Sequence, residues 1–187
     1  MPKILAFAGS FRKGSYNKRV LKIAVDGARE AGAEVTVLDL HDLPLAVYNA
    51  DDSFDPNAVK FQELLNKHDG FLVASPEYNG SVPGGLKNAI DWASRQSDKF
   101  ATNEVFKDKT VALITASPGS FGGLRCVQHL RGVFTIMGTW VLPMEIAVSF
   151  VGQKFEGEGD EMTDDKMKAT LKKLGASLVE AVKKRIA

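Results

Sequence analysis

The sequence lacks an excess of charge of either sign. Of its 187 residues, 24 are Lys or Arg and 23 are Asp or Glu, so the formal net charge is +1. Proteins that bind nucleic acids normally carry a basic excess or stripe, because neutralising phosphates supplies much of their affinity. Here the two signs are interspersed along the chain. We therefore expect no nucleic acid among the partners of this protein.

Cysteine is nearly absent, since Cys126 is the only one. A single thiol cannot form an internal disulfide, a CxxC redox pair or a thiolate cage for zinc. The three histidines, His41, His68 and His129, are too far apart in the chain to supply metal-ligand spacing within one element. We expect a cytoplasmic protein without a metal site, in which Cys126 acts as a small core or interface residue.

Long hydrophobic runs are also missing. Between residues 132 and 152 the only charge is Glu145, but Gly138, Pro143 and Glu145 interrupt this stretch, and a membrane span needs about 20 apolar residues. The apolar run Ile4 to Ala8 is shorter than the roughly 7 to 15 residues of a signal-peptide core. We interpret it as a first β-strand, and we expect no membrane insertion.

What the sequence does have is an alternation of two apolar patterns in a chain of ordinary globular composition, 44% hydrophobic and 25% charged. Its length favours one domain over residues 1–187. Short continuous apolar runs are typical of strands buried on both faces, and apolar spacing of three or four residues is typical of helices. The runs are 4–8, 35–40, 71–74, 111–116 and 141–148, and the helical patterns lie within 20–31, 59–65, 86–93, 124–137 and 167–182.

Five strands that alternate with five helices predict a doubly wound α/β fold. The strands are then parallel, joined by right-handed crossovers, and helices cover both faces of the sheet. In this architecture ligands bind outside the carboxyl ends of the strands, where the strand order reverses. The loops after the first, third and fourth strands are therefore the candidate site.

The first of these loops, residues 9–17, has the composition of an anion site. It leads directly into a helix, whose free N–H groups and dipole favour negative charge. Ser10, Ser15 and Asn17 add neutral donors, and Arg12 adds a charge-assisted fork. The loop predicts a phosphate site, with the alternative that Ser15 or Asn17 only caps the helix.

Two better-known phosphate loops do not match this segment. Gly9 and Gly14 have the Walker A spacing, but Ser15 and Tyr16 stand where that motif needs Lys followed by Ser or Thr. The dinucleotide pattern G-x-G-x-x-G is absent as well, because Ser10 and Phe11 follow Gly9. A nucleoside triphosphatase and Rossmann-type NAD binding at this loop are both disfavoured.

The other two loops are rich in residues that fix the backbone. Residues 75–85 hold two prolines and three glycines, and Asn79-Gly80 suits positive φ angles. Tyr78 could stack on a planar ring or fill a packing gap. Residues 116–123 form a third loop of small residues. Three such loops at one edge of the sheet predict a ligand site more strongly than any one of them does.

Together these motifs resemble the NADPH-dependent FMN reductase family, which includes bacterial quinone, azo-dye and chromate reductases. The resemblance rests on Gly-Ser-x-Arg-x-x-Ser-x-Asn at 9–17, Pro-Glu-Tyr-Asn-Gly at 76–80, Pro-Gly-x-Leu-Lys-Asn-Ala-Ile-Asp-Trp at 83–92 and Gly-Gly at 122–123. The motifs match in order and spacing over nearly the whole chain. The resemblance implies a flavodoxin-like five-stranded sheet of order 2-1-3-4-5, one non-covalent FMN, and NADPH or NADH as co-substrate.

The resemblance also implies roles for individual residues. It assigns the 5′-phosphate to Ser10, Arg12, Ser15, Tyr16 and Asn17, the isoalloxazine ring to Pro76, Glu77, Tyr78, Asn79 and Gly80, and the ribityl and pyrimidine side to Ser117. No side chain is assigned as catalytic, because the flavin carries the chemistry. Glu77 is a candidate acid or base, or it orders its own loop. A homodimer or homotetramer is implied, with Arg125 and Glu145 as candidate interface charges.

The function implied is transfer of hydride from NAD(P)H, through flavin N5, to quinones or similar small acceptors such as azo dyes, free flavin or chromate, by a ping-pong mechanism. The alternatives are a flavodoxin-type electron carrier that docks a protein partner and a non-catalytic flavin-binding protein. Such carriers are usually strongly acidic and use a Thr-rich phosphate loop, unlike this sequence. The sequence does not distinguish NADH from NADPH.

Three further features have structural interpretations. The acidic residues Glu156, Glu158, Asp160, Glu161, Asp164 and Asp165 predict a solvated loop before the last helix, or a surface for a partner. Thr163 can cap that helix. Trp92 and Trp140 are expected to pack in the protein rather than to stack on a ligand.

Overall fold

A computed structural model describes residues 1–157 and 159–186, so Glu158 of the acidic segment lies outside the described residues. Each predicted strand and helix is present. The strands are β1 (Lys3–Ala8), β2 (Glu34–Asp39), β3 (Gly70–Ser75), β4 (Thr110–Ala116) and β5 (Trp140–Val148). The helices are α1 (Tyr16–Glu30), α2 (Pro56–Asn66), α3 (Gly84–Ala93), α4 (Leu124–Ile136) and α5 (Asp165–Ile186), with short 3-10 helices η1 (Leu40–Asp42) and η2 (Val151–Lys154).

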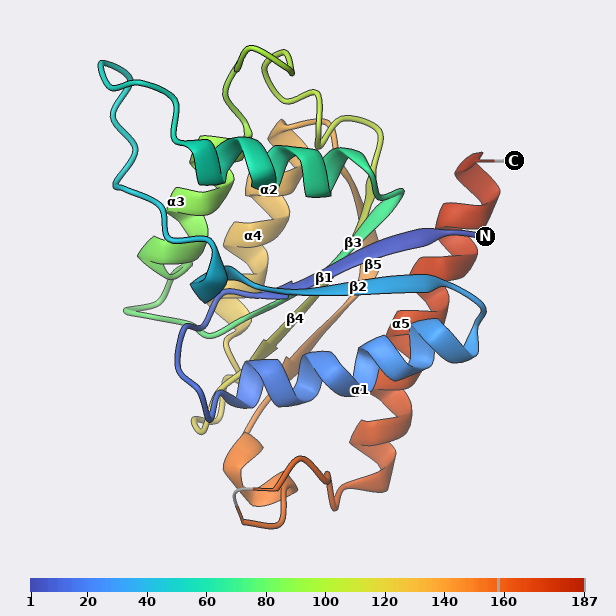
Figure 1. Cartoon of the computed structure of the whole chain (residues 1–187). Helices are drawn as coiled ribbons and strands as arrows, with labels where there is room; N and C mark the ends of the chain where they lie inside the picture. The colour runs from blue at the N-terminus through green and yellow to red at the C-terminus, as the bar shows by residue number, and fades with distance from the viewer. Residues whose placement is uncertain (158, 187) are drawn as a thin grey trace.

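The sheet confirms the predicted fold. All neighbouring strands pair in parallel, in the order β2-β1-β3-β4-β5. Helices α1 and α5 cover one face of the sheet, and α2, α3 and α4 cover the other (Figure 1). The strand order reverses between β1 and β3, so the loops after these strands diverge to opposite faces and leave room for a ligand at the edge.

The strand sequences explain why two cores form. β1, β3 and β4 lie in the middle of the sheet, and their apolar side chains are buried on both faces. Ile4 and Ala6 contribute to the core under α1 and α5, whereas Leu5 and Phe7 contribute to the core under the other three helices. Continuous apolar runs are therefore required here, because successive side chains of a strand enter different cores.

Two glycines let α1 and α5 approach closely. A Cβ atom on Gly27 would lie 2.1 Å from the backbone oxygen of Lys172, and one on Gly175 would lie 2.0 Å from that of Ala24. Real Cβ atoms do not come so close to a backbone atom, so both positions require glycine. This packing fixes α1, and with it the N-terminal end of α1 that borders the candidate site.

One of the packing predictions was only partly right. Trp92 and Cys126 are buried as expected, but Trp140 is 57% exposed, with the Arg185 guanidinium 4.3 Å from the centre of its ring. Trp140 begins β5, which is an edge strand, so one of its sides has no neighbouring strand. Within residues 1–157 and 159–186, no helix combines the length and apolar character needed to cross a membrane.

The segment before α5 differs from the prediction in its cap. The N–H of Met167 donates to Asp164 Oδ1 at 2.9 Å, so Asp164 rather than Thr163 caps the helix. Asp160 pairs with Lys22 at 2.7 Å and Asp164 pairs with Lys154 at 2.5 Å. Glu156, Asp160 and Glu161 are exposed, which agrees with the predicted solvated loop, and the two ion pairs tie this loop to the rest of the fold.

Candidate functional site

The three predicted loops meet in one cavity at the carboxyl edge of the sheet. Its volume is about 220 Å³. It is lined by Ser10, Arg12, Ser15, Tyr16, Asn17, Pro76, Glu77, Tyr78, Ala116, Ser117 and Pro118. All the predicted site residues except Asn79 and Gly80 line this cavity, and Ala116 and Pro118 are additional. Residues more than 100 positions apart therefore share one site, as the rule for doubly wound sheets predicts.

The loop after β1 ends at a helix N-terminus that carries no carboxylate. Ser15 caps α1, because its Oγ accepts a hydrogen bond of 3.2 Å from the N–H of Asn17. The first turn of α1, which is fully described, contains no acidic residue. The positive end of the helix dipole is therefore free for an external anion.

Asn17 joins the first loop to the third. Its Nδ2 donates to the carbonyl of Ala116 at 3.0 Å, and its Oδ1 accepts from the N–H of Ala116 at 2.9 Å. Asn17 is buried, and Ala116 is the last residue of β4. The Asn17 amide thus provides hydrogen-bond partners for the N–H and the carbonyl at the end of β4. In this way Asn17 joins two walls of the cavity.

Arg12 is the exposed positive charge of the cavity. Its side chain is exposed, and its Nη2 donates only to the carbonyl of Gly14 in the same loop, at 2.9 Å. Among residues 1–157 and 159–186, no carboxylate lies within 4.0 Å of its guanidinium. The guanidinium of Arg12 lies in the same cavity as a helix N-terminus and the hydroxyl of the buried Ser10. Because it has no ion-pair partner among the described residues, it is suited to bind phosphate.

The loop after β3 is a preformed turn. The N–H of Tyr78 donates to the carbonyl of Ser81 and the N–H of Ser81 to that of Tyr78, each at 3.0 Å. Asn79 (φ 50°) and Gly80 (φ 78°) both have left-handed backbones, as predicted, which makes the turn type I′. Within the described residues, the N–H groups of Asn79 and Gly80 have no acceptor, and they are available to a ligand at the rim of the cavity.

Glu77 holds this loop against the start of α4. Its Oε1 accepts from Nε and Nη2 of Arg125 at 2.9 and 2.5 Å, and its Oε2 accepts from the N–H of Cys126 at 3.1 Å. Burial alone would raise the pKa of Glu77, but the hydrogen bonds from Cys126 and Arg125 outweigh it and lower that pKa. Glu77 is therefore ionised at neutral pH and orders its loop, which does not suit it to act as an acid.

The loop after β4 is tight because it crosses close to the sheet. Gly122 (φ 61°) and Gly123 (φ 91°) have left-handed backbones, and a Cβ on Gly123 would lie 2.8 Å from that of Thr115. Ser117 Oγ accepts from the N–H of Gly119 at 3.1 Å, and the Ser117 carbonyl accepts from the N–H of Val151. Ser117 is thus fixed at the wall opposite the first loop.

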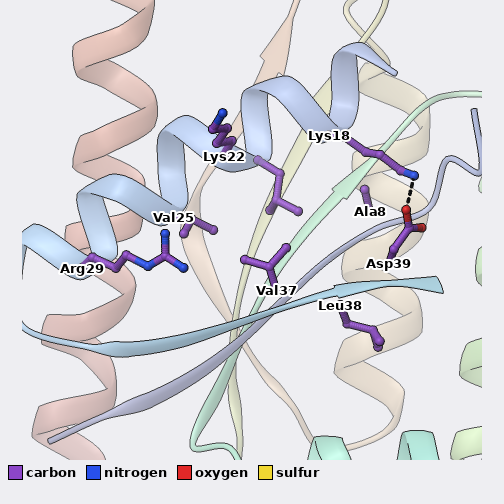
Figure 2. A pocket seen from close by; sticks show the side chains of 9 residues that line it. Ala8, Lys18, Lys22, Val25, Arg29, Val37, Leu38 and Asp39 are labelled. Carbon is purple, nitrogen blue, oxygen red and sulfur yellow. Dashed lines mark hydrogen bonds and ion pairs between the residues drawn. The ribbon is translucent and has the colours of Figure 1, made fainter. Parts of the chain in front are cut away.

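Another cavity, of about 330 Å³, lies between α1 and the edge strand β2 and is mainly apolar. Leu21, Val25 and Val37 are among its lining residues, and Lys18 faces Asp39 at one end, with an ion pair of 2.5 Å (Figure 2). Ala8 and Lys18, which flank the first predicted loop, line this cavity, but no residue of the three loops themselves does. Across the described residues, no three His, Cys, Asp or Glu side chains gather where they could share a metal ion.

Sequence reasoning missed Arg19, which lies beside the site. Arg19 is buried in α1, and its guanidinium lies 3.9 Å from the ring centre of Phe155. The available signal was its position, three residues after Tyr16 and four before the buried Ile23, which places an arginine on the apolar stripe of the helix. The apolar residues of this helical pattern begin at Val20, so the pattern itself does not include Arg19.

Comparison with known sequences agrees with the geometry of the three loops. A family model described as NADPH-dependent FMN reductase matches residues 2–153. An NAD(P)H-dependent FMN reductase of Pseudomonas aeruginosa is 37% identical over 168 residues, which cover 88% of this chain and 86% of that protein. A quinone reductase of Escherichia coli K12 is 34% identical over 168 residues, which cover 87% of this chain and 84% of that protein.

Comparison with solved structures extends the agreement to the fold. The flavoenzyme NAD(P)H:(acceptor) oxidoreductase FerB of Paracoccus denitrificans matches with a TM-score of 0.83 at 27% identity, and the match covers 99% of both chains. The family model spans most of the chain, including all three loops that form the cavity. The chain belongs to the NADPH-dependent FMN reductase family.

Proposed function

We propose that the chain, as an oxidoreductase of this family, binds FMN in the cavity formed by the loops after β1, β3 and β4. The observation that carries the proposal is the convergence of these loops. The loop after β1 offers the helix N-terminus, Arg12 and the hydroxyl groups of Ser10 and Ser15, which suit a phosphate. The loops after β3 and β4 offer Pro76, Tyr78 and Pro118, which suit a flat ring. The residues present therefore fit FMN.

When bound, FMN supplies a ring whose N5 takes hydride from NAD(P)H and passes it to an acceptor. The protein contributes position and electrostatics. The Glu77–Arg125 ion pair holds the turn at residues 78–81 in place, and this leaves the N–H groups of Asn79 and Gly80 free to donate to the ring edge. Donors fixed in advance stabilise negative charge on a ring without the cost of reorganisation.

We propose quinones and similar small molecules as the acceptors. Tyr78, on the rim of the cavity, is 53% exposed, so the ring-binding end is open to solvent. An open face admits NAD(P)H first and the acceptor after it leaves, which is a ping-pong cycle. The Escherichia coli relative, whose name is quinone reductase, supports this class of acceptor.

Purification and kinetics test this function. The protein should bind FMN with one molecule per chain, lose its flavin absorbance when NADPH is added without oxygen, and regain it when a quinone follows. Double-reciprocal plots at several quinone concentrations should be parallel lines. A protein that binds FMN but does not oxidise NADPH or NADH would instead be a carrier or a non-catalytic flavin protein, and a protein that does not bind FMN would refute the site.

We further propose that a second copy of the chain covers the rim of the cavity. Phe121 is 61% exposed and Leu124 is exposed as well, and both lie on the loop and helix next to Tyr78 and the Glu77–Arg125 pair. Exposed apolar side chains gathered at one edge are typical of an interface. Light scattering of the FMN-bound protein should give a dimer or tetramer, and Phe121→Ser should shift it toward the monomer.

A further inference from the structure

A second cavity, distinct from the one between α1 and β2, borders the FMN cavity at Arg12 and Tyr16. It has a volume of about 510 Å³ and is lined by Arg12, Gly14, Tyr16, Arg19 and Gly157. Arg12 and Tyr16 line both cavities, so the two are neighbours with a shared wall. No residue that the resemblance assigns to the flavin ring lines this second cavity.

Arg19 is the unusual member of this lining. It is 7% exposed, and its guanidinium lies over the rings of Phe155, at 3.9 Å, and Tyr16, at 5.3 Å. Its described polar contact is a long hydrogen bond of 3.4 Å from Nη2 to the carbonyl of Gly157. Its Nε is buried and, within the described part of the chain, has no hydrogen-bond partner.

Within the described part of the chain, Arg19 forms no ion pair with an acidic side chain. Among residues 1–157 and 159–186, no carboxylate lies within 4.0 Å of its guanidinium. Asp160 is near enough for Arg19 to help lower its pKa, but the main cause is its hydrogen bond to Lys22, at 2.7 Å. Stacking on aromatic rings offsets only part of the cost of burying a guanidinium. A cation built into the wall of a cavity in this way is suited to an anionic ligand.

We propose that Arg19 forms a second anion site, next to the wall that Arg12 shares with the FMN cavity, and that this site takes the 2′-phosphate of NADPH. The inference rests on the proposed function, because that reaction brings a phosphorylated nucleotide to the neighbouring cavity. A phosphate monoester matches the fork of a guanidinium, and NADH lacks this group. The site therefore gives this chain a preference for NADPH, which its sequence motifs did not reveal.

The experiment uses the FMN-loaded protein and three probes: 2′,5′-ADP, 5′-AMP and inorganic phosphate. Calorimetry should show that 2′,5′-ADP binds about 10- to 100-fold more tightly than 5′-AMP, which is the range for one charged hydrogen-bonded contact. Arg19→Gln should remove that difference, and Arg19→Lys should keep part of it. Lys13→Gln is the control. Lys13 is an exposed cation of the loop after β1, which leads into the helix of Arg19, and it lines neither cavity.

Three results would overturn the inference: equal affinity of wild type for 2′,5′-ADP and 5′-AMP, an unchanged preference in Arg19→Gln, or inorganic phosphate that binds as tightly as 2′,5′-ADP. The third result would mean that the site takes free phosphate. If Arg19→Gln does not fold, the wild-type comparison and Arg19→Lys decide the question.

The proposed function is tested separately in the same variants. FMN affinity and turnover with NADH should be unchanged in Arg19→Gln, while kcat/KM for NADPH should fall about 10-fold or more. A variant that loses FMN together with turnover on both nucleotides would place Arg19 in the FMN site and refute the second site. A wild-type protein that binds 2′,5′-ADP but no FMN would refute the proposed function and leave the anion site standing.

Discussion

The loop after β1 and the loop after β3 line the same cavity but are held in different ways. The side chain of Arg12, in the first loop, donates a hydrogen bond to the carbonyl of Gly14 and lies over the ring of Tyr16, both within or next to its own loop. The second loop is held by its turn, by the Glu77–Arg125 pair and by a contact of 2.9 Å between Ser81 and His129. The first loop thus leaves the Arg12 guanidinium for a ligand, whereas the second is formed before any ligand arrives.

This difference matches what each loop is proposed to bind. A phosphate is small and doubly charged, so a guanidinium that is free to reach it contributes most when the ion arrives. A ring edge needs donors at fixed positions, and donors on a rigid turn lose little entropy on binding. Replacing the exposed Arg12 in the first loop should therefore change affinity alone, whereas replacing the residues that hold either loop in place should change stability as well.

The largest effect should come from Asn17→Ala, which removes the anchor under the first loop. It leaves the buried N–H and carbonyl of Ala116 without partners, at a cost of about 1–3 kcal/mol each. The free energy of unfolding in urea should fall by about 2–6 kcal/mol. Asn66→Ala, at an exposed position, is the control and should stay within about 0.5 kcal/mol of wild type. A loss below 1 kcal/mol for Asn17→Ala would show that water replaces both bonds.

Arg12→Ala should weaken FMN binding without unfolding the protein. A charge-assisted hydrogen bond contributes about 1.5–3 kcal/mol, which corresponds to roughly 10- to 100-fold in the FMN dissociation constant. Fluorescence titration of the apoprotein measures this change, with Lys13→Ala as the control. The stability of the apoprotein should not change, since Arg12 is exposed and bonds only within its loop. Unchanged FMN affinity would refute the assignment of Arg12 to the phosphate.

Gly80→Val should strain the second loop. The φ angle of Gly80 is 78°, and a left-handed backbone costs a residue with a Cβ about 1–2 kcal/mol. The new Cβ would also lie 3.5 Å from Nε of Arg125, beside its ion pair. We expect a loss of about 1–2 kcal/mol in unfolding free energy together with weaker FMN binding. Gly84→Val is the control, because a Cβ at this position meets nothing within 4 Å, and it should change the unfolding free energy and the FMN affinity far less. If Gly84→Val and Gly80→Val have equal effects, the strain of the turn is not the cause.

The fold could be predicted from the sequence because its signals are local. Each buried strand is a short apolar run, and each loop of the site follows such a run directly, so the rule for parallel sheets places the loops together. The left-handed turn at Asn79-Gly80 was predicted for the same reason, since two adjacent residues determine it.

The contacts that hold the site could not be predicted, because they join distant residues. Asn17 bonds to Ala116 and Glu77 to Arg125, and no sequence pattern links either pair. The burial of Arg19 depends on Phe155, which reaches α1 only after the chain has passed through β5. Trp140 is a different case: it is expected to pack in the protein, but it begins β5 at the edge of the sheet and is largely exposed.

The smallest effect, and the one that depends on pH, should come from Glu77→Gln. More than half of the Arg125 side chain is exposed, so solvent screens the pair and the loss at pH 7 should be below about 1 kcal/mol. The folded protein lowers the pKa of Glu77. Its stabilising contribution is therefore complete above the unfolded value of about 4.3 and is lost as pH falls through the lower folded value. Urea unfolding should show a gap between wild type and Glu77→Gln that is constant from pH 7 to 5 and closes below about pH 4. A gap that persists at pH 3 would mean that the shape of the side chain, and not its charge, holds the turn.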